Sequence, residues 1–104
     1  MAKIIPVGCT AVHTFIYPYS EAETAVIYIT YKQKFGIAAE KSKEDIRFMG
    51  EGKIIAYLTQ TDTLKFKQNE PVEIQIRARL TDGRVIKSNI VKASTDELLK
   101  KGEI

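Results

Sequence analysis

Nine consecutive residues of strict alternation between apolar and polar side chains constrain the fold of this chain more than any other feature. They lie in the segment Pro71–Leu80, where Val72, Ile74, Ile76, Ala78 and Leu80 alternate with Glu73, Gln75, Arg77 and Arg79. Successive side chains of a β-strand point to opposite faces of its sheet. The pattern therefore predicts a strand with one buried face and one face in water.

The residues after this strand predict a hairpin through Thr81-Asp82-Gly83 into a return strand at Val85–Ala93. A two-residue loop would turn Lys87 and Asn89 toward the core, because a shift of one residue moves every side chain to the other face. A three-residue loop with a left-handed Gly83 instead places Ile86, Ser88 and Ile90 on the core side. Because burial favours the second set, we expect the three-residue loop.

Further short segments rich in Tyr, Thr, Ile and Val predict the remaining strands. They are Ile4–Val7, Val12–Tyr17, Thr24–Gln33, Phe35–Glu40, Asp45–Met49 and Lys53–Leu58. The middle of Thr24–Gln33 is apolar on both faces, which indicates a central strand covered on both sides. Because no segment is long enough for a crossover helix, parallel α/β folds are excluded. The expected fold is all-β, an antiparallel two-sheet sandwich of about seven strands.

Two segments have the spacing of a helical capping box. Thr59 and Asp62 predict a single helical turn at Gln60–Leu64 that crosses between the sheets. Ser94 and Glu97 predict a short C-terminal helix of about seven residues within 94–104. Because so short a helix is unstable alone, its leucines are expected to dock on their own sandwich or on a neighbour. These leucines are Leu98 and Leu99.

Composition limits the classes of protein that this chain can represent. Its 104 residues are expected to form one domain, 1–104. The net charge of +3 is too small to indicate a nucleic-acid-binding or polybasic membrane protein. A single cysteine excludes an intrachain disulfide. With no signal peptide and no apolar run of about 18 residues, we expect a chain without a membrane segment.

Catalytic chemistry finds little support in the residue pattern. Cys9 and His13 are the only thiol and imidazole, and on one strand they lie about 13 Å apart, too far for a hydrogen bond. We expect a small buried or edge cysteine and a surface or edge histidine. The carboxylates fall in loops without the paired arrangement of a glycosidase. We therefore expect no enzyme, no catalytic residue, no cofactor and no metal site.

Two groups of residues are candidates for contact with a partner. Arg77, Arg79 and Lys87 are expected to cluster on the outward face of the last hairpin, with Tyr28 or Tyr31 on an adjacent strand. Such a face is a solvated surface or a polar protein interface. Tyr17 and Tyr19 flank a proline in a predicted loop, and tyrosine is enriched in interfaces as well as in strands.

The runs Ile54–Phe66 and Val72–Ile90 carry a family resemblance. Their order is a strand, a Leu-Thr-x-x-Asp-Thr turn, a second strand, an Asp-Gly hairpin and a return strand. This combination resembles small Ig-like structural proteins of phages and prophages of Gram-positive bacteria. Over residues 10–93 the chain is similar to the N-terminal module of phage baseplate upper proteins.

The resemblance implies an Ig-like fold without catalytic residues. It further implies a virion protein, assembled in the host cytoplasm, that packs as a homo-oligomer against copies of itself or other virion proteins of the tail, baseplate or neck. The terminal segments Met1–Gly8 and Ser94–Ile104 are expected to act as arms toward neighbours. Because the single domain expected over 1–104 has no counterpart of the appended domain of the baseplate proteins, a capsid decoration protein of the same fold is an alternative.

A second alternative is a small nucleic-acid- or host-protein-binding module that uses Arg77, Arg79 and Lys87. Glu73 shares their row and the net charge is small, so nucleic acid is not the expected partner.

Overall fold

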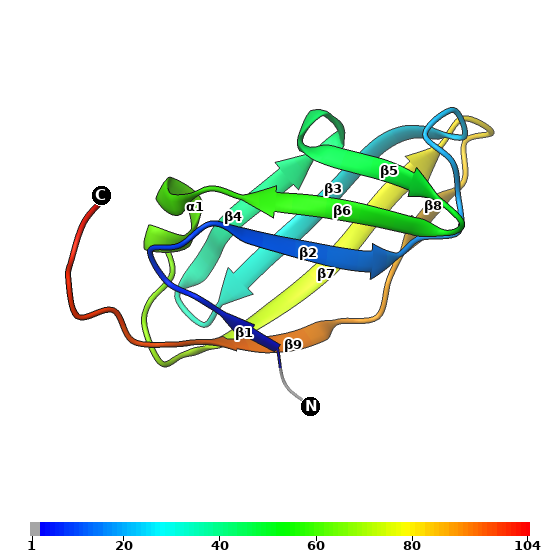
Figure 1. Cartoon of the computed structure of the whole chain (residues 1–104). Coiled ribbons are helices and arrows are strands. Elements are labelled where there is room, and N and C mark those ends of the chain that lie inside the picture. Colours follow the sequence, from blue (N-terminus) through cyan, green and yellow to red (C-terminus); the bar gives the residue numbers. More distant parts are fainter. Residues whose placement is uncertain (1–2) are drawn as a thin grey trace.

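Two β-sheets packed face to face make up residues 3–104, the part of the chain that the computed structural model describes (Figure 1). The strands are β1 (Lys3–Ile5), β2 (Ala11–Ile16), β3 (Thr24–Gln33), β4 (Gly36–Ser42), β5 (Ile46–Gly50), β6 (Lys53–Leu58), β7 (Pro71–Leu80), β8 (Val85–Lys87) and β9 (Val91–Thr95). A 3-10 turn, η1 (Lys43–Asp45), and a one-turn helix, α1 (Gln60–Leu64), complete the elements.

The larger sheet has the order β1-β9-β7-β3-β4, with β8 also paired to β7, and the smaller sheet has the order β2-β6-β5. The ten-residue strands β3 and β7 are antiparallel neighbours at the centre. β1 joins parallel to β9, whereas all other pairs are antiparallel. This is the arrangement of an Ig-like β-sandwich, so the predicted fold class is confirmed.

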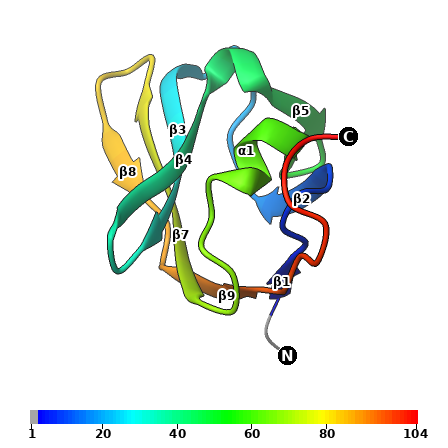
Figure 2. The same cartoon turned by 90° about the vertical axis from the view of Figure 1, so that its left-hand side faces the viewer.

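Apolar side chains from the inner faces of both sheets fill the space between the layers. Figure 2 shows the two layers edge-on. The largest fully buried ones include Tyr31, Ile27, Ile29, Ile54, Leu58, Val72 and Ile74. At one end the predicted turn α1 crosses between the layers (Figure 2). The Thr59 hydroxyl accepts from the Asp62 N–H, and the Asp62 carboxylate accepts from the Thr59 N–H. Buried Phe66 follows α1 and closes that end of the core.

The hairpin after β7 has the predicted three-residue loop. The Leu80 N–H donates to the Arg84 carbonyl at 2.8 Å, and the Gly83 N–H donates to the Leu80 carbonyl at 2.9 Å. Gly83 has a φ of 94°, a left-handed conformation that glycine adopts without steric cost. As expected, Ile86 packs against the core.

The prediction of a single return strand over 85–93 is wrong beyond Lys87, because the chain forms two strands, β8 and β9, with a break between them. Ala78 pairs with Ile86, but Ile74 pairs with Val91, so the return strand contains one extra residue. The Ser88 hydroxyl accepts from the Ile76 N–H at 2.9 Å and stabilises this bulge. Beyond the bulge the faces exchange, so Ile90, a predicted core residue, is 51% exposed. Val91 and Ala93 point inward in its place.

The predicted C-terminal helix is also wrong. Ser94 and Thr95 belong to β9, which pairs with β7 on one side and β1 on the other. The Asp96 carboxylate accepts the Val7 N–H at 2.8 Å, across 89 residues of sequence. Residues 96–104 contain no helix. A capping box satisfies only a few local donors, whereas pairing on both edges satisfies the whole strand backbone.

The outer face of β3 is open, contrary to the expectation that this strand is covered on both sides. Ile27, Ile29 and Tyr31 are buried on its inner face, while Tyr28 on its outer face is 43% exposed. The apolar outward residues of β3 therefore reflect strand propensity and an exposed surface, not a third layer.

Candidate functional site

The outward residues predicted from the hairpin gather on the outer face of β3, β7 and β8. Arg77 pairs directly with Tyr28 of β3 on one side and with Lys87 of β8 on the other. Arg79, two residues along, pairs with Val26 and Val85 in the same way. The structure therefore brings the three predicted cations onto one surface, beside a tyrosine ring. We call this surface, made of Val26, Tyr28, Arg77, Arg79, Val85 and Lys87, the basic face.

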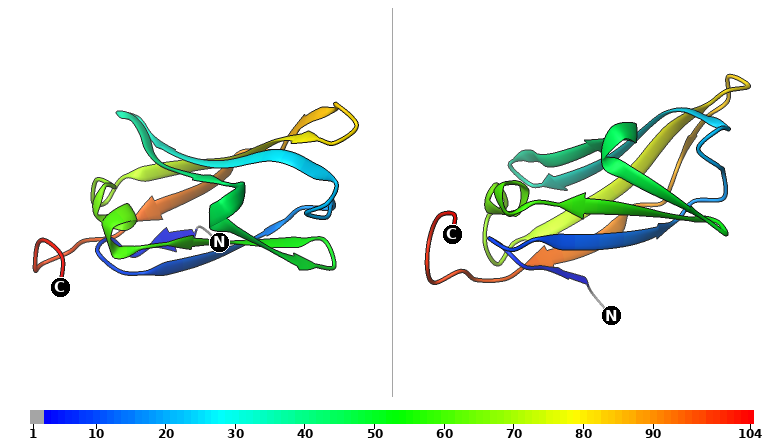
Figure 3. Two further views of the ribbon diagram at one scale, coloured as in Figure 1. Left: turned by 90° about the horizontal axis from the view of Figure 1, so that it is seen from above. Right: turned by 45° about the horizontal axis from the view of Figure 1, so that its top comes forward.

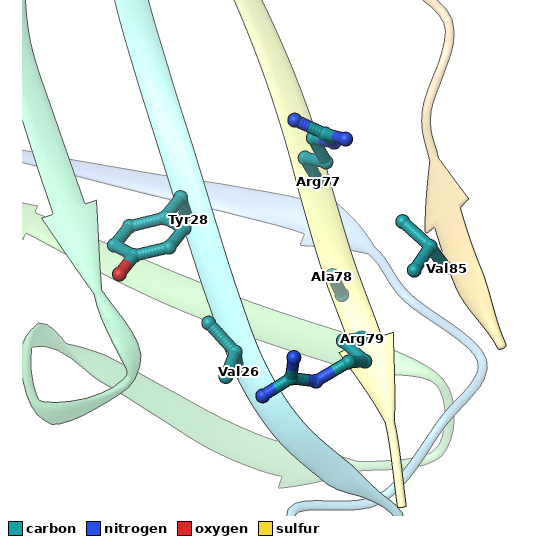
Figure 4. A pocket seen from close by; sticks show the side chains of 6 residues that line it. All are labelled: Val26, Tyr28, Arg77, Ala78, Arg79 and Val85. Carbon is teal, nitrogen blue, oxygen red and sulfur yellow. The ribbon is translucent and has the colours of Figure 1, made fainter. Parts of the chain in front are cut away.

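The basic face is hollowed where these strands meet (Figure 4). A shallow depression of about 380 Å³ is lined by Val26, Tyr28, Arg77, Ala78, Arg79 and Val85. The Arg79 side chain extends across β3 toward Val26, whereas Val85 stands on the opposite side of β7 (Figure 4). The hollow combines cationic groups with an aromatic ring and aliphatic walls.

Within residues 3–104, none of the three cations of the basic face forms an ion pair. The ion pairs there are Lys41–Asp62 at 2.6 Å and Arg84–Asp82 at 2.8 Å. Arg84 lies at the hairpin tip beside the basic face, and its pKa is raised by the hydrogen bond and the charge of Asp82. Arg77, Arg79 and Lys87 therefore present their charge to solvent.

A second surface, which the sequence analysis did not identify, covers the outer face of the smaller sheet. Val12 is 58% exposed and pairs with Tyr57, which is 44% exposed. Thr14 pairs with half-buried Ile55, and Ile16 is 85% exposed. We call these five residues the apolar face. The sequence contains a signal for this surface, because β2 and β6 carry apolar residues at both odd and even positions. A strand with only one buried face needs apolar residues at alternate positions only.

The two loop tyrosines do not form the predicted contact surface. Tyr17 is only 3% exposed, and its hydroxyl hydrogen-bonds to the Thr24 hydroxyl at 2.7 Å. Burial raises the pKa of the Tyr17 phenol. Tyr19 is half-buried, packs its ring on Tyr17 and lies 5.8 Å from the Arg84 guanidinium. Tyr17 is thus a core residue, and Tyr19 is only partly available to a partner.

The two C-terminal leucines have different environments. Leu98 is half-buried and packs against Gly8, where an added Cβ would lie 2.7 Å from the leucine Cδ2 atom. Its N–H donates to the Gln68 side chain at 3.0 Å. Leu99 is 88% exposed. The tail and the β7–β8 hairpin tip lie at opposite ends of the molecule (Figure 3). Of the predicted arm over 1–8, residues 1 and 2 lie outside the described residues.

His13 is buried, contrary to the expected surface or edge position. It is 8% exposed, and its Nδ1 atom hydrogen-bonds to the Tyr31 hydroxyl at 2.8 Å. Burial raises the pKa of Tyr31, so the phenol stays protonated. Cys9 is exposed. Nowhere in residues 3–104 do three or more His, Cys, Asp or Glu side chains gather as a metal ion requires. Neither helical element of the described chain is long and apolar enough to cross a bilayer.

Comparison with solved structures finds a similarity at the level of the fold. No family model matches the sequence, and no curated protein matches it. Among solved structures, the chain is similar to the V domain of amphioxus IgVJ-C2, with a TM-score of 0.35 and 9% sequence identity. That similarity covers 90% of this chain and 99% of the V domain.

Proposed function

We propose that this protein is a non-enzymatic structural component of a phage virion, located in the tail, baseplate or neck, that acts by packing against copies of itself and other virion proteins. A capsid decoration protein of the same fold is the alternative location. The phage context rests on the family resemblance of residues 54–66 and 72–90. The observation that carries the packing role is the apolar face, on which Val12 and Tyr57 are exposed side by side and Ile16 is exposed further along β2.

The composition of the apolar face favours a second copy of the chain as its occupant. Its centre is uncharged, and the nearest cations are Lys53, opposite Ile16 at one end, and Arg47, opposite Ile55 on the edge strand. A two-fold axis in the plane of the interface and perpendicular to the strands would stack the apolar rows of the two copies and place the two Lys53 residues at opposite ends. Isologous contacts of this kind are the commonest in homo-oligomers.

The area of the apolar face indicates how strong a single contact through it can be. Six residues at about 3.4 Å along two strands, each about 4.8 Å wide, give a footprint of roughly 200 Å². A stable pair of proteins buries about 800 Å² on each partner. One such contact is therefore weak, and a symmetric array that combines several contacts suits it better than an isolated dimer.

Light scattering on a sizing column, over a wide range of protein concentration, tests this role. We expect the apparent mass to rise with concentration toward a discrete oligomer. Ile16→Glu should return the protein to a monomer, because it places a charge in the apolar face. Ile37→Glu is the matched control, since Ile37 is 63% exposed on the other sheet.

Two results would contradict the proposal. One is a wild-type protein that stays monomeric at every concentration. The other is a loss of association in Ile37→Glu equal to that in Ile16→Glu, which would remove the apolar face from the explanation.

A further inference from the structure

We propose that the hollow of the basic face is a docking site for an extended acidic segment of a protein partner. The inference rests on the proposed packing function and adds the chemistry of one partner. It concerns the outer face of the larger sheet, on the opposite side of the sandwich from the apolar face.

The spacing of the two arginines matches an extended chain. Arg77 and Arg79 are successive outward residues of β7, so their Cα atoms lie about 6.8 Å apart. A partner segment in extended conformation repeats its side chains at the same interval, so two carboxylates at positions i and i+2 can each meet one guanidinium. The planar guanidinium forms paired hydrogen bonds with a carboxylate, which a lysine ammonium does not.

The charges of this site are not neutralised by the protein itself. Within the described residues, Arg77 and Arg79 have no ion pair, and Lys87 beside Arg77 adds a third free cation. Arg84 differs, because Asp82 holds its guanidinium at 2.8 Å. Both guanidinium groups are therefore available to the anions of a partner.

The walls of the hollow indicate that the partner also supplies an apolar side chain. Val85 is 60% exposed and Tyr28 is 43% exposed, although both stand beside arginines. An aliphatic side chain next to the carboxylates would cover these atoms. Tyr and Arg around an apolar centre are the residue types that carry most binding energy in protein interfaces.

The surroundings of the hollow favour a protein segment over a polynucleotide. Toward the other end of β7 the outward residues are Gln75 and then Glu73. On β4, the Glu40 carboxylate accepts a hydrogen bond from Thr30 on the same face. Carboxylates thus interrupt the cations within a few residues, whereas a polynucleotide needs a continuous cationic track. A short segment with two carboxylates fits the cluster as it stands.

A labelled peptide with the core Glu-Ser-Glu-Ser-Leu tests the inference, because its two carboxylates and its leucine share one side when it is extended. Binding is measured by fluorescence anisotropy at about 50 mM salt, where exposed ion pairs are weakly screened. The binding site is mapped by amide chemical shifts. We expect saturable binding, with shifts at Val26, Tyr28, Arg77, Arg79 and Val85. The peptide with both Glu replaced by Gln should bind at least about tenfold more weakly.

Variants of the protein test whether Arg77 and Arg79 bind the peptide. We expect Arg77→Gln and Arg79→Gln each to weaken binding about threefold to tenfold, and the double variant more. Lys92→Gln is the matched control, because it removes the same charge from β9, outside the hollow. It should change the affinity less than about twofold.

Several outcomes would overturn the inference. These are equal binding of the Gln peptide, wild-type affinity in the double variant, shifts confined to the apolar face, or tighter and more salt-sensitive binding of a thymidine oligonucleotide. Failure of this site and failure of the packing role are distinguishable. A monomeric wild type that binds the peptide contradicts the packing role, whereas a self-associating wild type that ignores the peptide contradicts this site.

Discussion

At the scale of single residues, buried polar atoms decide which side chains are core and which are surface. The phenol of Tyr17 lies against Thr24, and that of Tyr31 lies against His13, so both rings are buried with their polar tips bonded. Tyrosine fills cores and interfaces equally well, so composition and position did not separate Tyr17 from an interface residue. The distinction depends on whether a partner for the hydroxyl lies inside the fold.

Thr95 shows the same principle at the end of β9. Its hydroxyl accepts from the Glu70 N–H at 3.0 Å and donates to the Lys67 carbonyl at 2.5 Å. Thr95→Val keeps the shape but leaves the Glu70 N–H without this acceptor. We expect the free energy of unfolding to fall by about 1–2 kcal/mol in urea titrations.

Ser94→Ala is the control for this substitution. If residues 94–101 formed a capped helix, loss of the Ser94 hydroxyl would cost about 1 kcal/mol and Thr95→Val would cost little. In a strand, Ser94→Ala should stay within about 0.5 kcal/mol of the wild type. The order of the two effects therefore distinguishes strand from helix.

At the scale of the elements, a helix of one turn persists because tertiary contacts support its capping box. α1 is too short to form alone, but Asp62 at its third position also binds Lys41 of β4 at 2.6 Å. The buried Thr63 hydroxyl donates to the Cys9 carbonyl at 2.8 Å. α1 is thus held to β4 of the larger sheet and to the loop between β1 and β2. A second capping box joins Ser42 and Asp45 at η1. Among the described residues no lysine forms an ion pair with Asp45, and the box supports only a 3-10 turn.

The Asp62 carboxylate makes the stability of α1 dependent on pH. Burial alone would raise its pKa, but hydrogen bonds from Lys41 and Thr59 outweigh burial and hold the pKa below its ordinary value. The folded protein thus favours the ionised form more than the unfolded chain does. The resulting stabilisation is complete above about pH 4, the ordinary range of aspartate, and is lost as the pH falls through the lower folded pKa.

Asp62→Asn tests this linkage. We expect it to lower the free energy of unfolding by about 1–3 kcal/mol at pH 7, because Lys41 loses its anionic partner. The difference from the wild type should shrink as the pH falls below about 4, because the wild-type carboxylate becomes protonated. Asp45→Asn is the control, since its capping box is exposed, and it should cost less than about 1 kcal/mol. A deficit in Asp62→Asn that does not change with pH would contradict the explanation.

At the scale of the whole molecule, the two ends of the described chain hold each other. β1 pairs with β9, Asp96 accepts from Val7, and Leu98 packs on Gly8. The first part of the arm expected over 94–104, as far as Leu98, is therefore part of the sandwich itself. Beyond that point, Glu103 accepts from the Thr61 hydroxyl, while Leu99 and Ile104 are almost fully exposed.

Two truncations distinguish the contribution of residues 94–98 to stability from that of residues 99–104. A chain that ends at Leu98 should keep its melting temperature within about 4 °C of the wild type. A chain that ends at Ala93 loses the β9 pairs of Ser94 and Thr95 and the contacts of Asp96 and Leu98, and should melt at least about 10 °C lower. Thermal unfolding followed by circular dichroism measures both. Equal melting temperatures would show that the two ends do not stabilise each other.

Signals that depend on near neighbours were sufficient for much of the fold. Alternation over 71–80 predicted β7 and its faces, Gly83 with the burial of Ile86 predicted the loop, and Thr59 with Asp62 predicted α1. The outward position of Arg77, Arg79 and Lys87 followed from the same alternation. Each of these depends on the geometry of a strand, a turn or a helical turn, which a few consecutive residues determine.

Only the tertiary structure decided the features that depend on distant partners. The bulge at Ser88 needs the Ile76 N–H, and the strand at Ser94–Thr95 needs β1 and β7 on its two sides. The apolar face likewise arises because β2 lies beside β6 with no third layer outside them. Local sequence allowed a helix at 94–101 and a straight return strand, and long-range backbone pairing was stronger than both because it satisfies more hydrogen-bonding groups at once.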